Sequence, residues 1–160
     1  MKAKIRYGMF ETNSSSCHAI QIKKSKYNYS GLFIDDNGFA HSSFGEFGWE
    51  FEEYCYPTSK LEYALTMVAM TEPFTTEEEF YQTKGFKEIN TLLREKCHCL
   101  GLIIDNGFND NAYSHDINGY IDHQSCCYSS LDDFLADYAI SLERFIFDRN
   151  VVLKTGNDNC

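Results

Sequence analysis

Three Asn-Gly pairs limit what this chain can fold into: Asn37-Gly38, Asn106-Gly107 and Asn118-Gly119. Residues that favour β-strands flank each pair. Asn-Gly is the strongest short-range sequence signal for a two-residue β-hairpin turn, because both turn residues have positive φ angles in the type I′ turn. The pairs therefore predict a sheet built from hairpins.

Sequence signals for the starts of helices lie between the segments that are expected to form strands. Ser59 begins a capping box that ends at Glu62, Thr76 is followed by three glutamates, and Ser130 precedes an apolar stripe. A break is expected near Gly85. Strands are expected at 18–22, 100–104, 145–147 and 151–153, with a half-buried strand from alternating residues around Trp49. Since strands and helices do not alternate regularly, we expect a single α+β domain over residues 1–160, with a mostly antiparallel sheet and three helices.

The charge of the chain restricts its partners. The formal net charge is −10, from 24 acidic and 14 basic residues. This charge disfavours direct binding to nucleic acid or to an anionic membrane. It fits a basic protein partner, or a protein that occupies a nucleic-acid groove by imitating phosphates. The plainer alternative is that the acidic surface only keeps the protein soluble.

Cysteine usage and hydropathy predict the compartment. The seven cysteines are an odd number, and the N-terminal residues contain no apolar secretion signal. No apolar run approaches the ~20 residues of a membrane span. We therefore expect a reduced protein of the cytoplasm, with free and mostly buried thiols.

The third Asn-Gly pair leads to a candidate histidine site. A type I′ turn at Asn118-Gly119 would place His115 opposite Asp122, and would put His123 on the other face of the hairpin. A carboxylate that holds an imidazole orients a general base. The alternative is an exposed cross-strand ion pair of under ~1 kcal/mol.

A polar run near the N-terminus offers hydroxyl groups to such a site. Glu11 and Asn13 lead into three serines, which include Ser15 and Ser16, and His18 follows. This run is suited to an anion-binding loop or a serine nucleophile. The alternative is a loop whose side chains hydrogen-bond to their own backbone. The candidate catalytic residues are therefore Ser15, Ser16, His18, Asp122 and His123.

Aromatic and acidic residues interleave between residues 46 and 56. In an interface, the aromatic side chains would be the anchors and the glutamates a charged rim. The alternative for the aromatic side chains is core packing. With the polar C-terminal residues, the candidate binding residues are Glu11, Asn13, Trp49, Glu50, Phe51, Glu52, Tyr54, Asn157 and Asp158.

No metal or cofactor is expected. Cys97-His98-Cys99 lacks the CxxC spacing of zinc sites, and the loop from Asp105 has its glycine in the wrong position for calcium. The glycines fit neither a P-loop nor a dinucleotide fingerprint.

Patches along the whole chain resemble a group of small uncharacterised proteins of bacteriophages and bacterial mobile elements. The patches are 10–18 (FETNSSSCH), 48–50, 60–63, 121–125 and 157–159. The resemblance implies a phage-like origin and supplies no catalytic residues. We therefore expect an acidic accessory protein that binds and modulates a host protein, with a defence nuclease as one target. The alternatives are a small hydrolase or nucleotide-binding enzyme that uses the Ser/His/Asp site, and a structural or virion-associated component.

Overall fold

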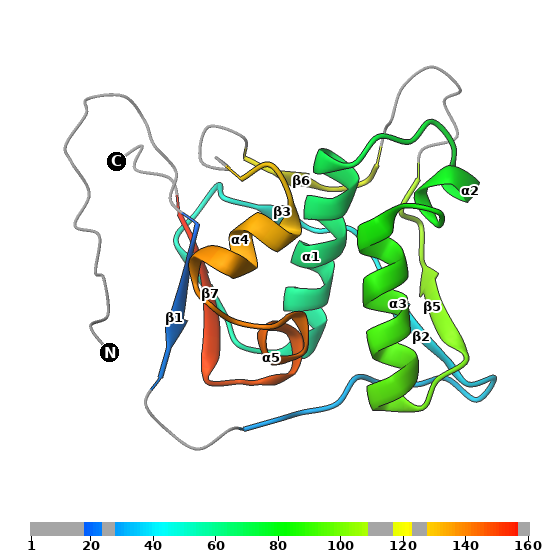
Figure 1. Cartoon of the computed structure of the whole chain (residues 1–160), viewed down its shortest axis with the longest axis horizontal. Coiled ribbons are helices and arrows are strands. Elements are labelled where there is room, and N and C mark those ends of the chain that lie inside the picture. Colours follow the sequence, from blue (N-terminus) through cyan, green and yellow to red (C-terminus); the bar gives the residue numbers. More distant parts are fainter. Residues whose placement is uncertain (1–17, 24–27, 109–116, 123–127, 157–160) are drawn as a thin grey trace.

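The computed structural model describes residues 18–23, 28–108, 117–122 and 128–156. Helix α1 (Pro57–Thr71) lies in the middle of the molecule (Figure 1). Helix α3 (Lys84–Cys97) packs on one side of it, and α4 (Leu131–Asp137) and α5 (Leu142–Phe147) pack on the other. A single turn of helix, α2 (Glu77–Phe80), precedes α3.

The strands of the described residues form three small groups. An antiparallel sheet has the order β1 (Ala19–Ile22), β7 (Val151–Thr155), β4 (Glu52–Tyr54). The other two groups are parallel pairs: β2 (Phe39–Ser42) with β5 (Gly101–Ile104), and β3 (Glu46–Phe47) with β6 (Tyr120–Ile121). The fold is consistent with the α+β class. The antiparallel three-stranded sheet agrees with the expectation, but the described residues also contain two parallel pairs that were not expected, and five helices where three were expected.

The type I′ turn predicted at Asn118-Gly119 is also wrong. Neither residue has a positive φ angle. The Asn118 backbone N–H donates to the Gly107 carbonyl, and its side chain donates to the Asn106 carbonyl. A Cβ on Gly119 would lie 2.4 Å from Phe44 Cβ, so this glycine permits close packing. The predicted pairing of His115 with Asp122 therefore loses its basis, and His115 itself lies outside the described residues.

Asn37-Gly38 does lie in a tight turn, but the two residues are not the two central residues of a type I′ turn. The Gly38 N–H donates to the Asp35 carbonyl, and Ile34 bridges Ala40 across the turn. Gly38 alone has a positive φ of 87°, and Asn37 does not. This pattern is that of a longer hairpin loop with glycine at the left-handed position.

Helix starts were predicted well where a side chain caps the helix. The hydroxyl groups of Thr76 and Ser130 accept the backbone N–H three residues later, as expected. Helix α1, however, begins at Pro57 rather than after Ser59, because proline is pre-organised for the first helical position. The expected strand at 145–147 is part of α5, whose first turn is capped by Ser141.

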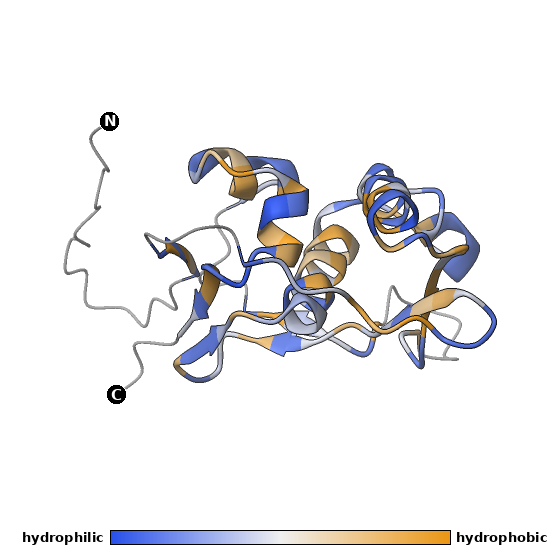
Figure 2. Ribbon diagram, turned by 90° about the horizontal axis from the view of Figure 1, so that it is seen from below, coloured by the Kyte–Doolittle hydropathy of each residue, from blue (hydrophilic) through white to orange (hydrophobic). Residues whose placement is uncertain are grey.

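The buried apolar side chains form one connected core around α1. Nearly the whole circumference of α1 is buried, including Tyr63, Leu65 and Met67. Hydrophobic and hydrophilic residues are mixed over much of the ribbon (Figure 2), and α3 buries one apolar face that contains Phe86, Ile89 and Leu93. Within the described residues, no helix is both long and apolar enough to cross a membrane.

Candidate functional site

His18 is buried beside the central helix. It precedes β1 directly, and only 7% of the residue is exposed. Its Nδ1 atom lies 3.1 Å from the hydroxyl oxygen of Tyr63 on α1, and the two rings stack with centroids 5.7 Å apart. The pairing of β1 with β7 brings this N-terminal histidine to the core.

Asp122 reaches the same place from a distant part of the chain. It follows β6, and its backbone N–H donates to the Phe47 carbonyl in register with the β3–β6 pair. Gly48 comes next after Phe47, with a φ of 102°. A Cβ on Gly48 would lie 2.9 Å from Asp122 Cβ and 3.0 Å from His18 Nε2. We call His18, Gly48, Tyr63 and Asp122 the His18 cluster.

The environment of His18 favours its neutral form. Burial lowers the pKa of His18 to about 4, although the nearby Asp122 carboxylate opposes this shift. Nε2 is buried and has no hydrogen-bond partner among the described residues. A neutral imidazole that is held at Nδ1 and lies beside a carboxylate is chemically able to accept a proton.

The structure thus brings together two of the five candidate catalytic residues, His18 and Asp122. Sequence reasoning missed the other two members of the cluster. Tyr63 and Gly48 appeared only within the patches 60–63 and 48–50 of the phage-like resemblance, where neither was assigned a role, and the positive φ of Gly48 had no sequence signal beyond the glycine itself. The remaining candidates lie outside the described residues: Ser15, Ser16 and His123 of the catalytic set, and Glu11, Asn13, Asn157 and Asp158 of the binding set.

The buried histidine predicts a loss of stability in acid. Because the folded-state pKa of about 4 lies below the ordinary 6.5, the unfolded state binds the proton more readily. The contribution of His18 is therefore complete above pH 6.5 and is lost as the pH falls toward 4, by on the order of 3 kcal/mol. Urea unfolding of the wild type and of His18→Gln across this range measures it. The expected result is a steeper decline for the wild type, and parallel profiles would contradict it.

A second candidate site is the acidic–aromatic surface, which we define as Glu46, Trp49, Glu50, Phe51, Glu52 and Tyr56. The aromatic members are exposed: Trp49 by 63%, Phe51 by 68% and Tyr56 by 58%. The expectation of a half-buried strand around Trp49 is therefore wrong, because residues 48–51 lie between β3 and β4 and belong to neither.

Tyr54 differs from the other aromatic residues of this segment. Its ring packs edge-on against Phe47 with centroids 5.3 Å apart, and its hydroxyl donates to Glu52. Burial, followed by the hydrogen bond to Glu52, raises the pKa of Tyr54. Tyr54 therefore anchors the segment to the core, and Trp49, Phe51 and Tyr56 face outward.

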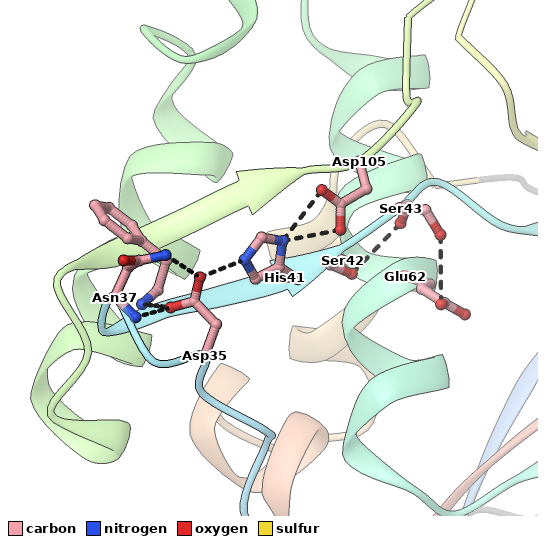
Figure 3. A network of polar contacts seen from close by, with 8 residues as sticks. Asp35, Asn37, His41, Ser42, Ser43, Glu62 and Asp105 are labelled. Atoms are coloured by element: carbon pink, nitrogen blue, oxygen red, sulfur yellow. Dashed lines mark hydrogen bonds and ion pairs between the residues drawn. The ribbon is translucent and has the colours of Figure 1, made fainter.

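Sequence reasoning also missed a histidine that bridges two aspartates (Figure 3). His41 on β2 places Nδ1 2.9 Å from Asp105 and Nε2 3.1 Å from Asp35. Hydrogen bonds to Asp105 and then to Asp35 raise the pKa of His41. With both ring nitrogens engaged by carboxylates, this side chain ties two turns together and has no free lone pair for a base. The similar Asp-containing turns after Ile34 and Ile104 were the signal in the sequence.

The described residues contain no group of three or more His, Cys, Asp or Glu side chains that could hold a metal ion. Asp35 and Asp105 contact different nitrogens of His41, so the imidazole ring lies between the two carboxylates. Cys97 ends α3, His98 is its left-handed cap, and Cys99 is buried. The described thiols, Cys55, Cys97 and Cys99, are free.

Lys60 is the most unexpected charged residue. It is completely buried in α1, and its ammonium group donates to the carbonyls of Asp148 at 2.8 Å and Val151 at 3.0 Å. Burial lowers the pKa of Lys60 to about 8, and Asp148 opposes the shift. Its role is to join α1 to the connection between α5 and β7.

Comparison with known proteins gives no family for this chain: no family model, no curated protein and no solved structure matches it.

Proposed function

We propose that this protein is an acidic accessory protein that binds a basic surface on another protein through its acidic–aromatic surface. The observation that carries the proposal is the exposure of Trp49, Phe51 and Tyr56 beside several glutamates. Large aromatic side chains are enriched at the centres of protein interfaces, because they bury a large area at a low cost in side-chain entropy.

The charge of the whole chain supports a basic partner. A net charge of −10 raises the rate of encounter with a cationic surface and repels phosphate. A host nuclease with a basic nucleic-acid groove has the required charge, and an acidic protein that fills this groove would compete with nucleic acid. The phage-like resemblance of the sequence patches fits such a role in the host cytoplasm, against a defence enzyme.

The proposal predicts which substitutions weaken binding of the partner. Trp49→Ala removes an aromatic anchor, and Glu50→Gln with Glu52→Gln removes two rim charges. We expect Trp49→Ala to weaken binding at least tenfold, since truncation of an interface anchor typically costs about 2 kcal/mol or more. We expect the double glutamine variant to weaken binding most at low salt, since rim charges act mainly on the rate of encounter. Immobilised protein incubated with host lysate at about 0.1 M and about 0.5 M salt measures retention of the partner, which is then purified for titration.

Matched controls separate this surface from general effects. Phe33→Ala removes an aromatic side chain that is 80% exposed elsewhere. Glu78→Gln with Glu95→Gln changes the net charge equally at exposed helical positions. A partner that is lost with the first two variants and kept with both controls supports the proposal. Retention that is unaffected by Trp49→Ala and by salt contradicts it.

A second candidate function is a small hydrolase or nucleotide-binding enzyme, favoured by the neutral His18 beside Asp122. The candidate nucleophiles, Ser15 and Ser16, lie outside the described residues, so only part of this site can be described and we rank this function second. A thermal-shift screen against nucleotides tests it. A stabilisation that disappears in His18→Gln supports an enzyme site, and the absence of any shift opposes it.

A further inference from the structure

The acidic–aromatic surface contains a hollow of about 390 Å³, lined by Glu46, Trp49, Glu50 and Glu52. Three glutamates and one exposed tryptophan therefore line the same hollow. The Trp49 ring is supported by Tyr120 of β6, with centroids 6.1 Å apart and a tilt of 33° between the planes. The hollow thus combines a supported aromatic surface with negative charge.

The three carboxylates lack a counter-ion within the described part of the chain. Glu53, their neighbour on β4, forms an ion pair with Lys154 at 2.6 Å. Glu46, Glu50 and Glu52 form no ion pair with any described lysine, arginine or histidine. Glu52 already accepts a hydrogen bond from the Tyr54 hydroxyl, but none of the three negative charges is neutralised by a described cation.

Outside the hollow, one aromatic member of the same surface already stacks with a guanidinium group of this chain. The Arg149 guanidinium carbon lies 4.5 Å from the centroid of the Tyr56 ring. Arginine stacks on aromatic rings through its planar, weakly hydrated guanidinium group, and tryptophan is the best aromatic partner for a cation.

We propose that the hollow binds an arginine side chain of the protein partner, with the guanidinium group stacked on Trp49 and hydrogen-bonded to the surrounding carboxylates. This inference rests on the proposed function and names its central contact. An arginine satisfies both parts of the hollow, because its face contacts the ring while its edge donates several N–H groups to carboxylates. A lysine ammonium group makes the charge contact but offers no plane to stack.

Trp49 is the only tryptophan of the chain, so its fluorescence reports binding at this hollow directly. The probes are three blocked tripeptides, acetyl-Gly-X-Gly-amide, in which X is arginine, lysine or citrulline. Citrulline has nearly the shape of arginine but carries no charge. We expect a saturable change with the arginine peptide, with a dissociation constant in the millimolar range. The lysine peptide should bind several-fold more weakly, and the citrulline peptide at least tenfold more weakly.

Two charge-matched variants locate the effect. Glu50→Gln with Glu52→Gln should weaken the arginine peptide about tenfold, whereas Glu78→Gln with Glu95→Gln should leave it unchanged. Equal binding of arginine and citrulline peptides, equal effects of the two variants, or no change in Trp49 fluorescence would each overturn the arginine site. The proposed function fails separately, when neither Trp49→Ala nor high salt reduces retention of the protein partner.

Discussion

Lys60→Met is expected to lower the free energy of unfolding by about 2–4 kcal/mol. Methionine retains the length of the apolar side chain but has no donor for the carbonyls of Asp148 and Val151. Replacing a whole buried ion pair by apolar residues is often harmless. Here the partners are backbone carbonyls that remain buried after the substitution, so their desolvation is no longer compensated.

Urea unfolding at pH 7 measures this loss, with Lys87→Met as the control at an exposed position of α3. The pH dependence offers a second measurement. Because burial lowers the pKa of Lys60 to about 8 from 10.5, the unfolded state binds the proton more readily between these values. The wild type should therefore gain stability relative to Lys60→Met as the pH rises from 8 to 9.5. A Met variant as stable as the wild type would contradict the assigned role of Lys60.

Gly48→Ala is the second substitution with a large expected effect, again about 2–4 kcal/mol of unfolding free energy. At a φ of 102° the backbone of Gly48 is in a region that residues with a Cβ rarely adopt. The added Cβ would also meet Asp122 Cβ at 2.9 Å and His18 Nε2 at 3.0 Å. The substitution therefore strains the backbone and separates the two polar residues of the His18 cluster.

Gly31→Ala is the matched control, because no atom lies within 4 Å of its added Cβ and its φ is not positive. Its expected effect is within about 0.5 kcal/mol. Thermal or urea unfolding of both variants makes the comparison. Equal stabilities of the two alanine variants would show that the backbone around Gly48 adjusts without cost, and would remove the argument that this glycine positions His18 and Asp122.

Local signals were sufficient where neighbours in the sequence hold one another. Thr76 and Ser130 cap the helices that they were expected to cap, and the apolar run at 100–104 forms β5. The same local reasoning was wrong at 145–147, where residues with high β propensity form α5 and bury their side chains in the shared core. Burial against distant elements outweighs the small intrinsic preference for a strand.

In the candidate sites, too, contacts between distant segments decided what local sequence signals did not. Sequence reasoning selected His18 from the polar run near the N-terminus, and Asp122 through a type I′ turn that does not form. Their proximity has a different cause, the parallel pairing of β3 with β6 and the antiparallel pairing of β1 with β7. The sequence left open whether the Trp49 side chain is exposed or packed in the core. Its exposure follows from the position of residues 48–51, which lie between β3 and β4 and belong to neither strand.

By itself, the sequence determined the acidic charge, the mixed α+β class and the capped starts of α2 and α4, because these depend on composition and on contacts across a few residues. Only the tertiary structure decided the strand partners, the burial of Lys60 and the meeting of His18 with Asp122. Those features depend on contacts between segments that are dozens of residues apart. Their energies come from packing and desolvation, which local sequence patterns do not encode.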